Sequence, residues 1–215
     1  MTPRYSEAPP VAGALRVAIA AENDDYDGAI LRRLLELALG EAVDPWASEM
    51  RFSGLWSVAT QADPFLHSAR AGGVKHALFA VDNDGGARRR PEHSPGHDAA
   101  QQAADPDGCR WCWLDRHVPA WWREGGRLQC VVVPVQTIET WLLHLRGDVL
   151  PAPSPEQFYS RQVLKRALFG RAKPPLARRV ELALELLARP DALERLRGRP
   201  SFRLVEVQLQ GWRRE

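Results

Sequence analysis

The chain has 215 residues, of which 45% are hydrophobic and 26% are charged. That composition is typical of a globular protein with one domain, or with one domain and an insertion. No apolar stretch approaches the roughly 20 residues that a membrane-spanning helix needs, and residues 1–12 are rich in proline and lack an apolar signal core. We therefore expect a cytoplasmic protein with a flexible leader over 1–12 and no membrane partner. Three cysteines provide no disulfide framework.

The net charge of +2 hides an asymmetry along the chain. From residue 157 onward there are 14 basic and six acidic side chains, a net charge of +8, so the remainder carries −6. An acidic front and a basic back fit a metal site that faces a polyanion. Basic residues that only form the solvent-exposed faces of helices would give the same charge distribution.

The first part of the chain predicts alternating strands and helices. A buried strand over 14–21 is followed by three aspartates and then by a helix over 29–40, which is the opening of a βαβ unit. A second strand over 53–60 and a short helix over 63–71 are weaker predictions. Another buried strand covers 74–81.

The second part is an insertion, the end of the sheet and a helical region. Residues 85–127 are rich in glycine, proline and histidine, and we interpret them as an insertion. A strand over 128–135 and a helix over 137–146 complete an α/β domain at 13–146 with a parallel sheet. After a Pro-rich linker, the C-terminal region 147–215 is predicted to be helical, over 156–169, 174–189, 191–198 and 201–212.

Carboxylates follow each of the three main predicted strands. Glu22 closes the first, Asp82 and Asp84 close the second, and Glu139 follows the third. Open α/β sheets bind ligands at the carboxyl ends of their strands, and clustered carboxylates stay ionised only beside a cation. Mg²⁺ or Mn²⁺ is the expected ion, because hard cations prefer oxygen ligands. Two such ions could clamp the attacking and leaving oxygens of a phosphodiester.

Each acidic residue also has a simpler interpretation. Asp82 and Asp84 could belong to a plain turn that ends at Gly85. Glu22 could be a solvated strand end. Glu139 would be favoured in the first turn of a helix by the helix dipole alone. The metal site is indicated by their joint placement.

Four segments resemble parts of the Toprim nucleases of the OLD and RloB type. Residues 17–35 resemble the first Toprim motif, a strand that ends in Glu before a helix, and 79–84 resemble its Asp-x-Asp motif. Residues 136–143 contain Glu-Thr-Trp-Leu-Leu, similar to a Glu-x-Trp-Leu-Leu signature, and 200–203 are similar to the tail of such proteins. One departure is Asn23, where the family usually has glycine.

The resemblance implies a Toprim-like fold and a Mg²⁺-dependent (or Mn²⁺-dependent) phosphodiester hydrolase. It would cut DNA or RNA, including tRNA, in anti-phage defence, often with a separate ABC- or SMC-like ATPase. Carried over by position, the acids at 22, 82, 84 and 139 become metal ligands, with Asp25 or Asp27 as supplements. Lys165 and Lys173 are candidates for the family's catalytic lysine. A non-catalytic binding subunit is the alternative. A primase-like transferase would need a phosphate-binding loop of the Walker type, which this sequence lacks. Homo-oligomerisation is left open.

The insertion contains a second metal-ligand pattern. His93 and His97 precede Cys109 and Cys112, and two close pairs separated by a short loop suit a structural zinc ion. His117 is a substitute ligand. A loop without metal is the alternative, and a redox CxxC is disfavoured because the motif is not expected to open a helix after a strand.

Two further features of the insertion have open interpretations. Four tryptophans could form a small core over the zinc, stack on bases or bind a partner: Trp111, Trp113, Trp121 and Trp122. Residues 88–90, three arginines, could bind phosphates or be a solvated loop. Cys130 is expected to be buried in a strand.

Overall fold

The computed structural model describes residues 12–83, 93, 108–134, 137–147, 161–172 and 174–213. Contacts divide them into two compact units, each built from separate stretches of the chain. The first unit contains 12–80, 114–132 and 205–213, and the second contains the described residues of 81–113 and 133–204. None of the helices in these ranges is long and apolar enough to cross a membrane.

The first unit contains a four-stranded sheet in the order β2-β1-β3-β4, and all of its strand pairs are parallel. The strands are β1 (Leu15–Ala21), β2 (Val43–Pro45), β3 (His76–Ala80) and β4 (Leu128–Val132). The strands expected over 14–21, 74–81 and 128–135 are confirmed with slightly shorter bounds. The α/β class with a parallel sheet, predicted from the alternating elements, is therefore correct.

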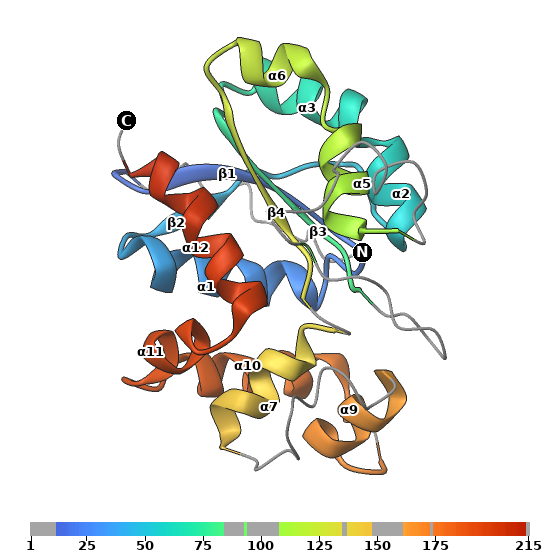
Figure 1. Ribbon diagram of the computed structural model, residues 1–215, viewed down its shortest axis with the longest axis vertical. Coiled ribbons are helices and arrows are strands. Elements are labelled where there is room, and N and C mark those ends of the chain that lie inside the picture. The colour runs from blue at the N-terminus through green and yellow to red at the C-terminus, as the bar shows by residue number, and fades with distance from the viewer. Residues whose placement is uncertain are drawn as a thin grey trace. The chain divides into compact units, whose positions relative to one another are not determined.

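Helices cover both faces of this sheet (Figure 1). Figure 1 shows α1 (Asp27–Leu39) on one side, and α2 (Leu55–Thr60), α3 (Ala62–Ala71) and α6 (Ala120–Glu124) on the other. This follows from the strand order: the chain leaves β1 in one direction to reach β2 and returns past it to β3, and right-handed crossovers then put the helices on opposite faces. All five residues of β3 are buried, as expected for a central parallel strand.

Helix α1 follows the predicted pattern closely. Its buried residues recur at helical spacing, and the helix ends at Gly40, whose φ of 78° is left-handed and suits glycine. The aspartate at its first position lies where a helix favours negative charge.

The prediction of a strand over 53–60 is wrong. That segment forms α2 after Gly54, which has a φ of 80° and turns the chain into the helix. Val58 and Ala59 are the buried residues of α2. The place beside β1 is taken instead by β2, which is only three residues long and ends at a proline, a residue that cannot donate a ladder hydrogen bond.

The second unit is mainly helical. It contains the first residues of α5 (Arg110–His117), then α7 (Glu139–Arg146), α9 (Arg161–Phe169), α10 (Leu176–Leu187), α11 (Ala192–Arg197) and the start of α12 (Pro200–Trp212). Helix α7 contacts α9, α10 and α11, and most of its residues are buried. Its Trp141 packs edge-on against Phe202 and donates a hydrogen bond to Ser201 Oγ at 3.0 Å. The helices expected after 156 are thus confirmed over the described residues.

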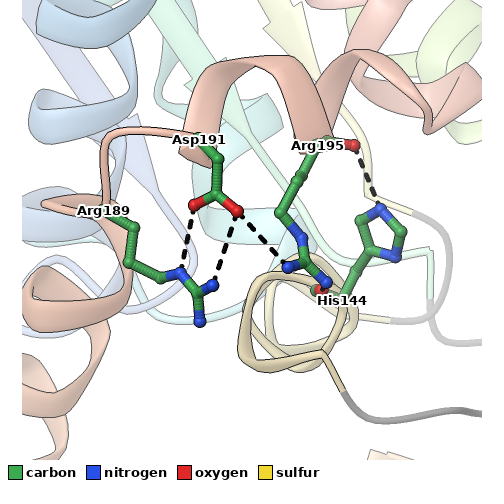
Figure 2. Close-up of polar contacts among 4 residues, drawn as sticks. All are labelled: His144, Arg189, Asp191 and Arg195. Atoms are coloured by element: carbon green, nitrogen blue, oxygen red, sulfur yellow. Dashed lines mark hydrogen bonds and ion pairs between the residues drawn. The ribbon is translucent and has the colours of Figure 1, made fainter.

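Reciprocal hydrogen bonds join the end of α7 to α11 (Figure 2). His144 Nε2 donates to the Arg195 carbonyl oxygen at 3.0 Å, and Arg195 Nη2 donates to the His144 carbonyl oxygen at 3.1 Å. The Asp191 carboxylate, just before α11, accepts from both Arg195 and Arg189. These side chains orient the C-terminus of the buried helix that begins at Glu139.

Candidate metal sites

The three main strands end in register at one edge of the sheet. Ala21 pairs with Ala80 across β1 and β3, and Ala80 pairs with Val132 across β3 and β4. The chain therefore leaves three adjacent parallel strands at the same level, which is where an open α/β sheet binds ligands. Glu22 follows β1 at once, and Asp82 lies two residues after β3.

Glu22 belongs to the first unit and is half-buried. Its carbonyl oxygen accepts a hydrogen bond from Gly54 at 3.2 Å, and the next residue, Asn23, forms an isolated bridge with Ser53. The Asn23 carbonyl oxygen then accepts from two amides that lead into α1. The backbone after β1 is thus held in place, whereas the expected grouping of Glu22 with acids of the second unit stays a prediction.

Asp82 and Asn83 form the exit from β3, in the second unit. Both are buried, with exposed fractions of 8% and 6%. The Asn83 N–H donates to the Pro134 carbonyl oxygen at 3.2 Å, which ties this exit to the segment that follows β4. Asn83 Oδ1 is buried and accepts no hydrogen bond from any described residue. Asp84, the other acid of the predicted pair, lies outside the described residues.

Glu139 and Lys165 lie together, although they are far apart in sequence. Glu139 is the first residue of α7 and is only 1% exposed, and its Oε1 lies 3.4 Å from Lys165 Nζ on α9. The same Oε1 accepts no hydrogen bond within the described part of the chain. Two predicted site residues are thereby brought into contact. Lys173, the second candidate lysine, lies outside the described residues.

His93, Cys109 and Cys112 form a group that could hold a metal ion. Their ligand atoms all lie within 4.8 Å of one another. His93 Nδ1 is 3.4 Å from Cys112 Sγ and 3.7 Å from Cys109 Sγ. Around a tetrahedral zinc ion, bonds of about 2.3 Å to sulfur and about 2.0 Å to nitrogen place these atoms roughly 3.5 Å apart. The observed separations agree with that value, so the donor set suits zinc.

The setting of the two cysteines bears on the redox alternative. Cys109 immediately precedes α5 and Cys112 lies in its first turn, so the motif opens a helix, but residues 108 and 109 just before that helix are not part of a strand. A helix start also favours thiolate charge, which serves a zinc ligand as well as a redox thiol. The imidazole beside both sulfurs favours the metal. His97 lies outside the described residues, and His117 is not part of the group.

The tryptophans of the insertion do not form one cluster. Trp111 packs on the cysteine pair, and its ring lies 4.2 Å from that of His93, as a small core beside a metal would require. Trp122 is buried in the first unit. Trp121 stacks on His67 and donates to the Asp63 carboxylate at 2.8 Å. The arginines at 88–90 lie outside the described residues.

Three buried polar residues of the second unit were missed from sequence. Thr137 and Asn83 each present a buried side-chain oxygen without a hydrogen-bond partner among the described residues. Arg110 is buried and donates through Nη1 to the Asp82 carbonyl oxygen. Each could have been found from its position next to a predicted site residue. Asn83 lies between two candidate acids, Thr137 lies two residues before Glu139, and Arg110 lies inside the CxxC motif.

Cys130 is buried in β4, as expected, and burial raises the pKa of its thiol far above the usual range. A thiol that stays protonated is a poor nucleophile and a poor metal ligand. Cys130 therefore contributes to the core of the sheet.

Comparison of the chain with protein-family models, with curated proteins and with solved structures gives no match. The resemblance to Toprim nucleases therefore rests on the short motifs in the sequence. Any function has to be argued from the residues and their geometry.

Proposed function

We propose that the protein is a Mg²⁺- or Mn²⁺-dependent endonuclease with a Toprim-like fold, in which Glu22, Asp82, Asp84 and Glu139 hold the metal. The substrate class is DNA or RNA, because hydrolysis of a phosphodiester is the reaction that such an acidic site promotes. In keeping with the family resemblance, we further propose a role in anti-phage defence, with any ATPase supplied as a separate subunit.

The observation that carries the proposal is the buried carboxylate of Glu139. An ionised carboxylate that is almost fully excluded from water is costly unless positive charge lies beside it. Lys165 supplies one such charge at 3.4 Å. Three oxygens in the segments that follow β3 and β4 along the chain are buried without a hydrogen-bond partner among the described residues: Asn83 Oδ1, Thr137 Oγ1 and Glu139 Oε1. Buried oxygens of this kind call for a water or an ion, and a hard divalent cation prefers oxygen ligands.

The chain's own residues would then divide the work. Glu22, Asp82, Asp84 and Glu139 would hold the divalent cation, which would supply activation of a water molecule and neutralisation of phosphate charge. Lys165, a compact point charge with a 26% exposed side chain, can turn from Glu139 toward a phosphate oxygen when a cation occupies the carboxylate. Lys173 is the alternative lysine for that role.

A second candidate function is a Toprim-like subunit that binds nucleic acid or a partner without cutting. Asn23 favours it, because the resemblance implies glycine at that position and a side chain restricts the approach of a phosphate. The acid set at the other positions argues for catalysis.

We also propose that the group of His93, Cys109 and Cys112 holds a structural zinc ion, with His97 as the fourth ligand. Support comes from the sulfur–nitrogen separations of 3.4 and 3.7 Å. A structural site needs a fourth protein ligand to close the tetrahedron, and His97 lies one short loop from His93 in sequence.

The test of the nuclease is cleavage of plasmid DNA and of total tRNA with Mg²⁺, Mn²⁺ or EDTA. Glu139→Gln is compared with Glu41→Gln, which alters an exposed acid after α1. We expect metal-dependent cutting by the wild type and by Glu41→Gln, and a loss of at least about 100-fold in Glu139→Gln, the scale of removing one preorganised charge.

Two other outcomes would each be decisive. Equal cutting by Glu139→Gln and the wild type would remove Glu139 from the site. Metal-independent binding of nucleic acid with no cutting, by zinc-loaded protein supplied with a cognate ATPase, would favour the non-catalytic subunit.

A further inference from the structure

Arg110 occupies an unusual position for an arginine. It is the first residue of α5, between the two cysteines of the metal-ligand group, and its side chain is only 6% exposed. Arginine is rarely buried unless its charge meets polar partners. Here the Nη1 group donates to the backbone carbonyl oxygen of Asp82, the first candidate acid after β3.

The peptide group between Asp82 and Asn83 is consequently held at both ends. Its oxygen accepts from Arg110, and its N–H donates to the Pro134 carbonyl oxygen at 3.2 Å. A peptide group fixed at both its polar atoms cannot rotate freely. The directions in which the Asp82 and Asn83 side chains leave the backbone are therefore set by these two hydrogen bonds.

One of the two hydrogen bonds comes from a residue between the two cysteines. Cys109 directly precedes Arg110 at the start of α5, Cys112 follows in the first turn, and both sulfurs lie beside His93 Nδ1. A metal ion bound there would fix the backbone of that turn, and with it the base of the Arg110 side chain. Without the ion, the two buried sulfurs and the half-buried imidazole would have only their mutual contacts of 3.4 and 3.7 Å to hold this turn.

We propose that Arg110 is a positioning residue that connects the two metal sites. Zinc at His93, Cys109 and Cys112 fixes the first turn of α5, and Arg110 in that turn holds the Asp82–Asn83 peptide so that the Asp82 carboxylate is oriented for a divalent cation. The inference rests on the proposed function for its last step and on the proposed zinc ion for its first, whereas the link from the first turn of α5 to the peptide stands on the Arg110 contact. A merely structural Arg110 would affect folding without altering cation affinity.

The experiment compares Arg110→Met and Arg110→Lys with Arg116→Met, an exposed arginine on the same helix, all as full-length, zinc-loaded chains. Three quantities are measured: zinc per chain, Mn²⁺ affinity by electron paramagnetic resonance, and hydrogen exchange of the Asn83 amide. Arg110→Met should keep its zinc, weaken Mn²⁺ binding by about 10-fold or more, the usual cost of losing an outer-shell contact, and exchange Asn83 faster. Arg110→Lys should recover part of both, and Arg116→Met should match the wild type.

Cys112→Ser tests the first half of the link. Loss of zinc in this variant should speed Asn83 exchange as strongly as Arg110→Met does, with the rest of the sheet still protected. Unchanged Asn83 exchange in either Cys112→Ser or Arg110→Met overturns the inference, as does a wild-type protein that binds no zinc.

A failure of the proposed nuclease function can be distinguished from a failure of the role proposed for Arg110. If wild-type protein loaded with zinc binds no Mn²⁺, the acidic site is wrong and so is the last step of the inference. Asn83 exchange still decides whether zinc and Arg110 hold the peptide. If Mn²⁺ binds normally in Arg110→Met, the positioning role of Arg110 is wrong, and the proposed nuclease function is unaffected.

Discussion

At the scale of single residues, the pair of Glu139 and Lys165 is the most informative contact in the protein. The carboxylate is almost fully buried, whereas the lysine side chain keeps a quarter of its surface in water. The acid therefore depends on a partner far more than the lysine does. A cation bound to Glu139 would take over part of what Lys165 provides.

Replacing Lys165 with methionine tests this dependence. In EDTA, Lys165→Met should lower the free energy of unfolding by about 2–3 kcal/mol, because a buried carboxylate loses its positive partner, with some discount for the partly exposed lysine. Saturating Mn²⁺ should reduce the difference from wild type by about 1 kcal/mol or more, because binding to the folded state restores positive charge. Urea unfolding with and without Mn²⁺ measures both values.

Lys75→Met is the matched control, because Lys75 is exposed and contributes only its backbone to the sheet. It should change stability little in either buffer. A Lys165→Met deficit that is the same with and without Mn²⁺ would count against Glu139 as a metal ligand.

At the scale of elements, the edge of the sheet at β4 is closed by a side chain. Gln208 on α12 accepts a hydrogen bond from the Val131 N–H at 2.9 Å and donates to the Val131 carbonyl oxygen at 3.0 Å. The amide thus replaces one residue of a further strand. Exposed strand edges otherwise invite pairing with another chain.

Gln208→Ala should lower the free energy of unfolding by about 1–3 kcal/mol, because it leaves two backbone groups of Val131 without these partners. Gln210→Ala, an exposed glutamine two residues along the same helix, should have almost no effect. Urea unfolding gives the stabilities, and size-exclusion chromatography reports any self-association of the opened edge. Equal stabilities of the two variants would show that water satisfies Val131 as well as Gln208 does.

A second element-scale feature is the junction of α7 with α11 at His144. Burial and, next, the positive charge of Arg199 lower the pKa of His144 below its usual 6.5, while the hydrogen bond to the Arg195 carbonyl opposes them. The unfolded chain therefore binds a proton on this residue at a higher pH than the folded chain does. Stability from His144 is fully present above about pH 6.5 and decreases as the pH falls toward the lowered pKa.

His144→Gln should flatten this part of the pH profile, since glutamine keeps an N–H donor but cannot be protonated. Between pH 7 and 5 the wild type should lose more stability than the variant, by about 1.4 kcal/mol for each unit by which the pKa is lowered. Chemical unfolding across that range measures the difference. Parallel profiles for the two proteins would mean that His144 titrates alike in both states.

At the scale of the whole molecule, the positive charge of the basic C-terminal region is only partly neutralised by acidic side chains. Arg178 pairs with Glu181 and Glu185, and the hydrogen bonds to these carboxylates raise its pKa. Arg166, Arg171 and Arg203 are exposed and form no ion pair within the described residues. These three are among the cations of this region that are available to phosphates.

The triple variant with glutamine at 166, 171 and 203 should bind nucleic acid more weakly, and the slope of log affinity against log salt should decrease by about one to three. Arg178→Gln removes one charge that is already offset, and should leave the slope nearly unchanged. Fluorescence anisotropy in EDTA from 50 to 200 mM salt separates the two cases. An unaltered slope in the triple variant would show that the basic region does not contact phosphates.

The elements that could be predicted from the sequence are those whose information is local. Runs of buried residues defined β1, β3 and β4, and helical spacing with a glycine exit defined α1. The grouping of His93 with the cysteine pair could also be predicted from their spacing, because the chain between them is short. These features depend on periodicity and neighbouring residues, which a sequence displays directly.

The remaining features depend on how distant parts of the chain pack together. The three-residue β2 and the helix α2 after Gly54 have too little local pattern to predict, because short elements take their form from what they pack against. The contacts of Glu139 with Lys165 and of Arg110 with the Asp82 carbonyl join residues far apart in the chain. Such pairs are set by how helices and strands pack, and a buried charge is stabilised by whichever partner the fold brings beside it.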